Sequence, residues 1–152
     1  ARSFAMAYTQ THQHQWIERA ESVARGIEPL WHEERGAYAA SAAQRGDDGH
    51  FSLSTNSYAA EALLALRHAT GQNHYRSRAE RIVDFIRREL FRDGIALAHV
   101  HRGRAASGDI WCSGCNWRLL GLLWRLGEEE DASAGTARAV SAKQIELARP
   151  HQ

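Results

Sequence analysis

The chain has 152 residues, of which 43% are hydrophobic, and its formal net charge is +1. This length and composition fit one domain with its own core. A net charge so close to zero does not favour nucleic acid or an anionic membrane as a partner. The longest apolar run, 62–66, is far shorter than the roughly 20 residues that cross a bilayer. With only two cysteines, we expect a soluble protein of the reducing cytoplasm.

Two long amphipathic helices are predicted, and they share one sequence pattern. Apolar residues recur at helical spacing along one face, while charged residues occupy the other face. Equivalent residues are 59 apart, as from Thr11 to Thr70 and from Ile27 to Ile86. A repeat of this length indicates a unit of two helices. The first apolar stripe is Trp16, Ala20, Val23, Ile27 and Leu30, and the second is Tyr75, Ala79, Ile82, Ile86 and Leu90.

A shorter, more apolar helix precedes each charged one, at 4–11 and at 56–70. The second of these has N-cap candidates in Thr55 and Asn56, and Gly71 is placed to end it. Stretches with glycine and alternating residues follow the charged helices, at 34–41 and 93–103, and predict short extended arms.

A third unit is predicted to begin with a helix over 115–127. Leu119, Leu120 and Gly127 would be equivalent to Leu63, Leu64 and Gly71 in the second unit. Beyond it, few large apolar residues remain, so we expect a short helix near 135–148 and a frayed end. The predicted organisation is a helical-hairpin domain over 1–128 and a weakly helical or disordered tail over 129–152.

The pattern carried by "YTQTHQHQWIERAESVARGI" and "LRHATGQNHYRSRAERIVDFI", within residues 4–103, resembles the (α/α) toroid superfamily. That superfamily includes six-hairpin glycosidases, N-acylglucosamine 2-epimerase-like isomerases and the toroid half of thioredoxin-fused proteins. The resemblance implies an all-α array of two to three helical hairpins with short extended arms. Five or six helices would make about half of a closed ring, so the chain is a fragment, one of two copies that close the ring, or a short open solenoid.

In such a toroid, the resemblance implies, ligands lie at the end formed by the arms and by the starts of the inner helices. Aromatic rings beside carboxylates and an arginine suit a sugar pocket, although the ordinary role of such tryptophans is in the core of the third hairpin. The candidate catalytic residues are Asp48, His50 and Asp109, and the candidate substrate-binding residues are Tyr58, Trp111, Trp117 and Arg118.

The stretch "GDIWCSGCNW" contains both cysteines, Cys112 and Cys115, and three interpretations stay open. The motif resembles the thioredoxin "WCGPC", but the strands and the cis-proline of that fold have no counterpart here. Together with His99 and His101 the cysteines could bind zinc, and "WCSG" resembles a zinc-ligand element of lanthionine cyclases, another toroid family. Alternatively, both thiols are only core residues at a helix start.

The leading functional hypothesis is a toroid-type pocket for a carbohydrate or similar polar small molecule, with zinc as the one possible cofactor. A second hypothesis is a non-enzymatic module that forms a homo-oligomer or joins a larger chain through Leu119, Leu122 and Trp124. A third is a thiol-disulfide protein that uses the Cys112–Cys115 pair. Whether the chain is an enzyme is left open, because fold does not imply function.

Overall fold

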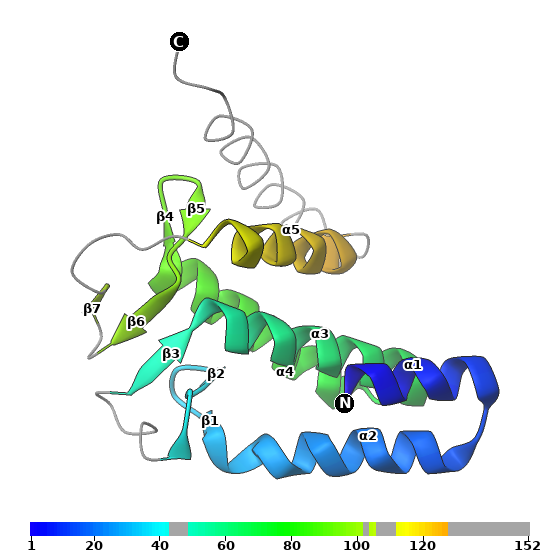
Figure 1. The fold of residues 1–152 in the computed structure, drawn as a ribbon. Coiled ribbons are helices and arrows are strands. Elements are labelled where there is room, and N and C mark those ends of the chain that lie inside the picture. Colours follow the sequence, from blue (N-terminus) through cyan, green and yellow to red (C-terminus); the bar gives the residue numbers. More distant parts are fainter. Residues whose placement is uncertain (43–48, 102–103, 106–111, 128–152) are drawn as a thin grey trace.

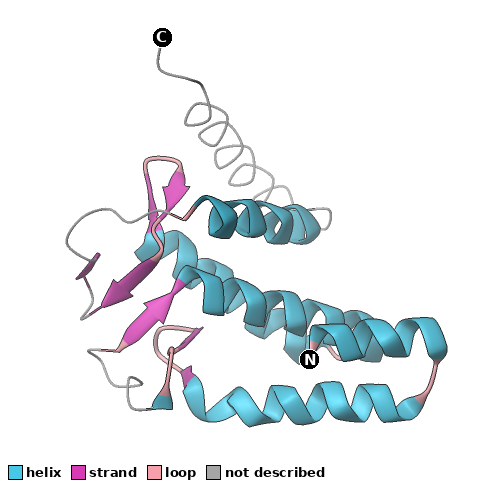
Figure 2. Ribbon diagram, viewed as in Figure 1, coloured by secondary structure: helices cyan, strands magenta, loops and turns pink. Residues whose placement is uncertain are grey.

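Helices make up most of the computed structural model, which describes residues 1–42, 49–101, 104–105 and 112–127, with backbone alone at 100, 101, 104, 105 and 127. The predicted all-α class is confirmed (Figures 1 and 2). A 3₁₀ turn, Glu28–Leu30, and a π-helical turn, Ile86–Leu90, extend the second and fourth helices. The five helices are α1 (Arg2–Thr11), α2 (His14–Ile27), α3 (Leu53–Thr70), α4 (Asn73–Phe85) and α5 (Ser113–Gly127).

The inner helices, α1, α3 and α5, lie side by side, with α3 in the middle (Figure 1). The outer helices, α2 and α4, pack against α1 and α3 respectively. Helices α1 and α3 each lead into their outer partner through a tight turn. At the end of α3, Gly71 has a φ of 74° and its N–H is bonded to the carbonyl of Arg67, which confirms the predicted stop.

Short antiparallel strands form the predicted extended arms, and they gather near the starts of α3 and α5 (Figure 2). Two of the arms are simple two-stranded hairpins. In a third, small sheet, β6 pairs with both β3 and β7, so arms from different repeat units join. The strands are β1 (Trp31–His32), β2 (Ala37–Tyr38), β3 (His50–Ser52), β4 (Phe91–Arg92), β5 (Ile95–Ala96), β6 (His99–His101) and β7 (Arg104–Ala105).

The main core lies between α3, α4, α5 and the arms, and its largest members include Tyr38, Phe51 and Phe85. The predicted stripe of α4 is confirmed at Ala79 and Ile82, which are fully buried.

On α2 the predicted face is partly wrong. The buried residues are Ile17, Ala20 and Ala24, whereas Val23 is 44% exposed. The face of α2 that carries Ile17, Ala20 and Ala24 is buried because it packs in a second, smaller core that α2 shares with α1.

Two further details differ from the sequence-based expectation. Helix α3 begins three residues before the predicted start, because the Ser52 side chain accepts a hydrogen bond from the N–H of Thr55 and caps the helix. Of the three residues predicted to form an assembly edge, Leu119 and Leu122 are buried in the core and only Trp124 is exposed, at 63%, so assembly through this helix stays a prediction. The predicted tail, 129–152, lies outside the described residues.

Candidate functional site

Two buried asparagines hold the arms against the inner helices. In the first turn of α3, Asn56 accepts a hydrogen bond from the N–H of Tyr38 (2.8 Å) and donates to its carbonyl (3.0 Å). In α5, Asn116 does the same with the N–H and the carbonyl of Ala96, both at 2.8 Å. Each amide also donates to the backbone carbonyl four residues earlier. We call this arrangement the asparagine clamp.

The asparagine clamp sets the register of the repeat. Asn56 and Asn116 make matching contacts, so equivalent positions in α3 and α5 are 60 residues apart. The predicted equivalence of Leu119 with Leu63 is wrong, because it is four residues out of this register. That alignment was wrong because α5 contains two leucine pairs, whereas α3 and α5 each contain a single asparagine.

Tyr58 and Arg118 follow the two clamps at equivalent positions and meet each other. Tyr58 is 55% exposed, and the Arg118 guanidinium carbon lies 3.8 Å from the centroid of its ring. A guanidinium over an aromatic face at this separation is a favourable cation–π contact. Both residues were predicted to bind substrate, and the structure brings them together.

Glu61 is a buried carboxylate at which the three inner helices converge. Its side chain is only 5% exposed, and it accepts hydrogen bonds from Arg2 of α1 (3.2 Å) and from Arg118 (3.2 Å) and Arg125 (2.7 Å) of α5. Three guanidiniums offset the cost of removing one carboxylate from water. Glu61 therefore positions arginines, and Arg118 is held both by Glu61 and by the Tyr58 ring.

Trp117 adds an open aromatic surface beside Arg118. Its side chain is 52% exposed, and nothing lies within 4 Å of the Cβ position at Gly114 or Gly121, one turn away on either side. The ring is thus accessible from solvent along this side of α5. We call Tyr58, Glu61, Trp117 and Arg118 the inner face.

An apolar pocket of about 260 Å³ adjoins the inner face at Tyr58. Its other walls come from the start of α1, the end of α2 and the start of α3. Burial raises the pKa of Tyr38, which also lines this pocket and whose hydroxyl lies 3.5 Å from Arg78. The pocket is lined by Ala1, Val23, Ile27, Leu30, Tyr38, Thr55, Tyr58, Ala59 and Ala62.

This arrangement is suited to binding a polar molecule that has hydroxyl groups and apolar faces. Guanidinium N–H groups donate hydrogen bonds, and aromatic rings cover C–H surfaces. Glu61 is already engaged by three arginines, so its role is to orient them.

Two histidines of the arms, His50 and His99, lie next to each other, although one was predicted to be catalytic and the other to bind a metal. The ring centroids of His50 (predicted catalytic) and His99 (predicted metal ligand) are 4.9 Å apart, because β3 and β6 are paired strands. The side chain of His101 lies outside the described part of the structure, as do Asp48, Asp109 and Trp111, so their predicted roles stay predictions.

Cys112 and Cys115 are joined as a disulfide at the start of α5. In this oxidised form neither sulfur is a thiolate, which is the form that binds zinc. Within the described residues, no three metal-ligating side chains cluster. Zinc binding by His99, His101, Cys112 and Cys115 stays a prediction for the reduced protein.

Sequence reasoning missed Glu61, Arg2 and Arg125. One signal was available for the glutamate: it stands inside the apolar run "YAAEALLAL", and an ionised side chain on a buried helix needs charged partners. The partners themselves come from α1 and α5, and no local pattern connects those helices.

No protein-family model matches the sequence, and a search of curated protein sequences finds no match. Among solved structures, the chain is similar to the crystal structure of a D-mannose isomerase, with a TM-score of 0.75 and 16% identity. The match covers 99% of this chain and 44% of that one, so the chain spans less than half the length of its neighbour. At this identity the likeness concerns the fold alone, which is that of a partial toroid.

Proposed function

We propose that this chain is part of a carbohydrate-processing toroid and that its inner face binds a sugar or a similar polar small molecule. One observation carries the proposal. Arg118, fixed by the Glu61 carboxylate, lies across the exposed ring of Tyr58, and the accessible Trp117 is its neighbour in the chain.

The chemistry of these groups fits a sugar. Arg118 uses one terminal nitrogen on Glu61, and within the described residues its other N–H groups remain able to donate to hydroxyl oxygens. Trp117 offers an aromatic face for the C–H side of a pyranose. Because Glu61 and Tyr58 fix the guanidinium before a ligand arrives, little side-chain entropy is lost on binding.

The neighbour of known structure supports the choice of ligand class, since it is a D-mannose isomerase. Isomerisation of an aldose requires proton transfer, for which imidazole is well suited near neutral pH. The proposal assigns this role to His50, with His99 beside it. Asp48 and Asp109, in the arm loops, are the further candidates for acid–base work.

Direct binding of D-mannose to variants of the full chain tests the proposal. Trp117→Ala is compared with Trp124→Ala, which removes an exposed tryptophan from the same helix two turns further on. We expect Trp117→Ala to weaken binding about tenfold, whereas Trp124→Ala changes it less than about twofold. Equal losses in both variants, or no binding by the parent chain, would contradict the proposal.

A further inference from the structure

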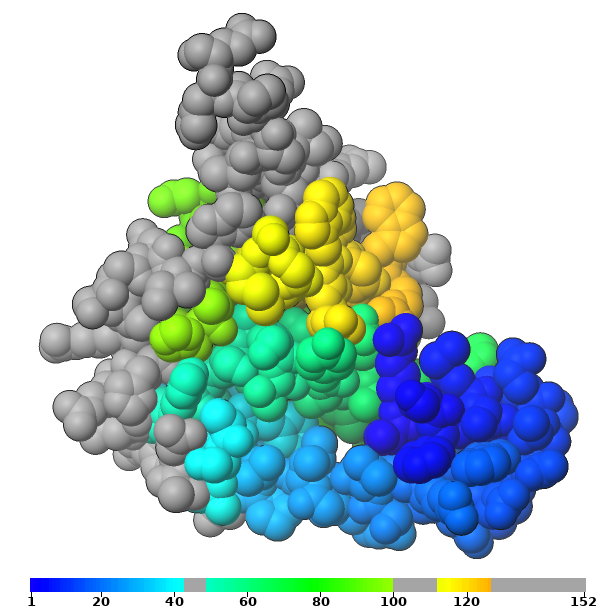
Figure 3. Space-filling view, in the orientation of Figure 1, coloured from blue at the N-terminus to red at the C-terminus, as the bar shows by residue number. Residues whose placement is uncertain are grey.

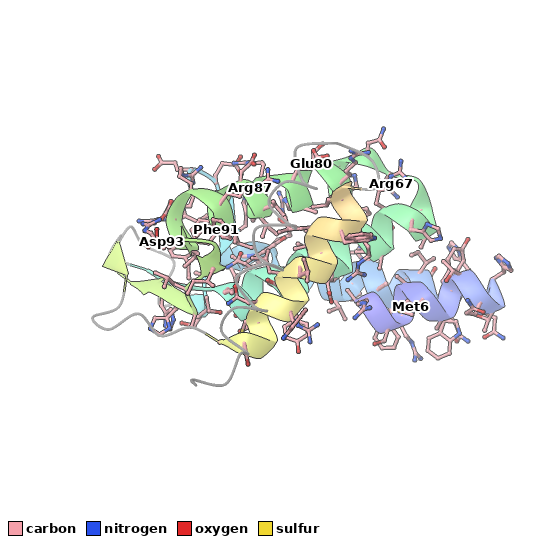
Figure 4. The ribbon with its side chains drawn as sticks, turned by 90° about the horizontal axis from the view of Figure 1, so that it is seen from above. Met6, Arg67, Glu80, Arg87, Phe91 and Asp93 are labelled. Atoms are coloured by element: carbon pink, nitrogen blue, oxygen red, sulfur yellow. A yellow bond between two sulfur atoms is a disulfide. The ribbon has the colours of Figure 1, made fainter. Side chains whose placement is uncertain are left out.

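A second pocket, of about 340 Å³, lies at the far end of the inner helices. In Figure 3, α1 (blue) and α5 (yellow to orange) border an exposed strip of α3 (green). Figure 4 shows Met6 of α1 and Arg67 of α3 at one end of the molecule, and Phe91 and Asp93 of the β4–β5 hairpin at the other. The pocket is therefore separate from the arms and from Tyr58, Trp117 and Arg118, none of which lines it.

Five basic side chains line this pocket, and no carboxylate does so among the described residues. Two of the five, Arg2 and Arg125, donate hydrogen bonds to the buried Glu61. Arg76 donates one to Glu80 at 2.6 Å. Arg67 is different, because its buried Nε has no hydrogen-bond partner among the described residues. The basic residues are Arg2, Arg67, His68, Arg76 and Arg125.

Helix dipoles explain only part of this cluster. Arg67, His68 and Arg125 lie in the last turns of α3 and α5, where the negative end of the dipole favours a cation. Arg2 and Arg76, however, lie in the first turns of α1 and α4, where the dipole disfavours one. Basic residues from both kinds of helix end converge on one cavity, which indicates an anionic ligand.

We infer that this pocket binds a small organic phosphate monoester. Guanidiniums match phosphate oxygens in geometry and charge, and a monoester presents three oxygens with nearly two negative charges. A carboxylate, with two oxygens and one charge, would use fewer of the donors. The apolar wall, formed in part by Met6, Leu64 and Leu126, fits the carbon portion of such a ligand. This second site does not depend on the proposed sugar site.

Phenyl phosphate is the probe that tests the pocket, titrated into the full chain by calorimetry. The first variant is Met6→Glu, with Met6→Gln as its matched control. Met6 lines the pocket and is 53% exposed, so neither change disturbs the core. We expect Met6→Glu to weaken binding at least about fivefold by charge repulsion, and Met6→Gln to change it less than about twofold. Equal effects of the two variants would overturn the inference.

A second pair of variants tests the guanidinium itself. Arg67→Met removes the unpaired donor, and Arg92→Met removes the same charge from the exposed β4 strand. Arg67→Met should weaken phenyl phosphate binding about tenfold, with circular dichroism confirming that it is folded. A similar loss in Arg92→Met would mean attraction by net charge alone and would exclude a specific site.

Two further ligands, and one variant of the proposed sugar site, complete the test. Inorganic phosphate should bind about tenfold more weakly than phenyl phosphate, because it leaves the apolar wall uncovered. Benzoate should also bind more weakly, and tighter binding of benzoate would overturn the phosphate assignment. Trp117→Ala should leave phenyl phosphate binding unchanged, so failure of the sugar site and failure of this site are distinguishable.

Discussion

Arg118 lies across the ring of Tyr58, with its guanidinium carbon 3.8 Å from the ring centroid, and the two residues hold equivalent places in successive repeat units. Each follows its clamp asparagine by two residues in the chain. The buried asparagine is thus the same in both units, whereas the residue two positions later, which lies nearer the solvent, differs between them. This combination provides a rigid frame with a chemically variable surface, on which a binding site can be built.

A double-mutant cycle should detect the contact between Tyr58 and Arg118. The variants are Tyr58→Ala, Arg118→Met and the double variant, with unfolding free energies measured in urea. We expect a coupling energy of about 0.5–1 kcal/mol, because the pair is partly exposed. Simple additivity of the two single changes would contradict a direct interaction.

Glu61→Gln should destabilise the chain by about 1–3 kcal/mol. The substitution keeps the volume but leaves three converging guanidiniums without their shared carboxylate. Glu80→Gln is the control, because its ion pair with Arg76 is partly exposed and links residues four apart on one helix, and such pairs contribute about 0.5 kcal/mol or less. Urea unfolding measures both, and similar values for the two would show that Glu61 has no special role.

The asparagine clamps should each contribute about 2–3 kcal/mol to stability. In Asn56→Ala or Asn116→Ala, the buried backbone N–H and carbonyl of the arm lose their partner and cannot reach water. Asn73→Ala, at the exposed start of α4, is the matched control and should change stability by less than about 0.5 kcal/mol. Thermal unfolding of the three variants compares them directly, and a neutral Asn56→Ala would refute the clamp.

Much of the fold could be predicted from the sequence, because it rests on local patterns. Helical spacing of apolar residues located the helices, and glycine placed the end of α3 correctly. The start of α3 and the buried face of α2 were missed. Those depend on the Ser52 cap and on packing against α1, which outweigh the local pattern.

The candidate site was predictable only in part. Tyr58, Trp117 and Arg118 were named because the toroid resemblance implies that ligands lie near the starts of the inner helices, and their binding role stays a prediction. Glu61 was not found, since its three arginines come from two other helices. Asn116 was also missed, because one amide in a sequence carries no information about the backbone hairpin that it binds.

Alkaline pH should destabilise the protein through Tyr38. Burial raises the pKa of its phenol above the ordinary value near 10, so the folded state favours the neutral form. Above pH 10 the unfolded chain loses this proton first, and stability therefore falls as the pH rises through the folded pKa. Below pH 10 the contribution is constant.

Tyr38→Phe is the variant that isolates this effect, because Tyr75 also has a raised pKa. Urea unfolding of both proteins from pH 8 to 11 should show a smaller alkaline loss in Tyr38→Phe. Ultraviolet titration of tyrosinate should show one phenol fewer that ionises late. Identical pH profiles for the two proteins would contradict the assignment to Tyr38.

The Cys112–Cys115 disulfide predicts that the oxidised protein contains no reactive thiol, because it has only these two cysteines. Thiol titration should find two thiols after reduction and none before. Metal analysis of the reduced protein then tests the zinc prediction, in which His99 and His101 complete the site. One zinc that is absent from Cys112→Ser/Cys115→Ser supports it, and equal zinc in both proteins rejects it.

The central claim is that the inner face binds a sugar, and a residue-resolved NMR titration with D-mannose tests it most directly. We expect saturable shifts at Tyr58, at the Trp117 indole N–H and at the Arg118 side chain, with little change at Trp124. Saturable shifts confined to other parts of the chain, or no shifts at all, would contradict the proposed site.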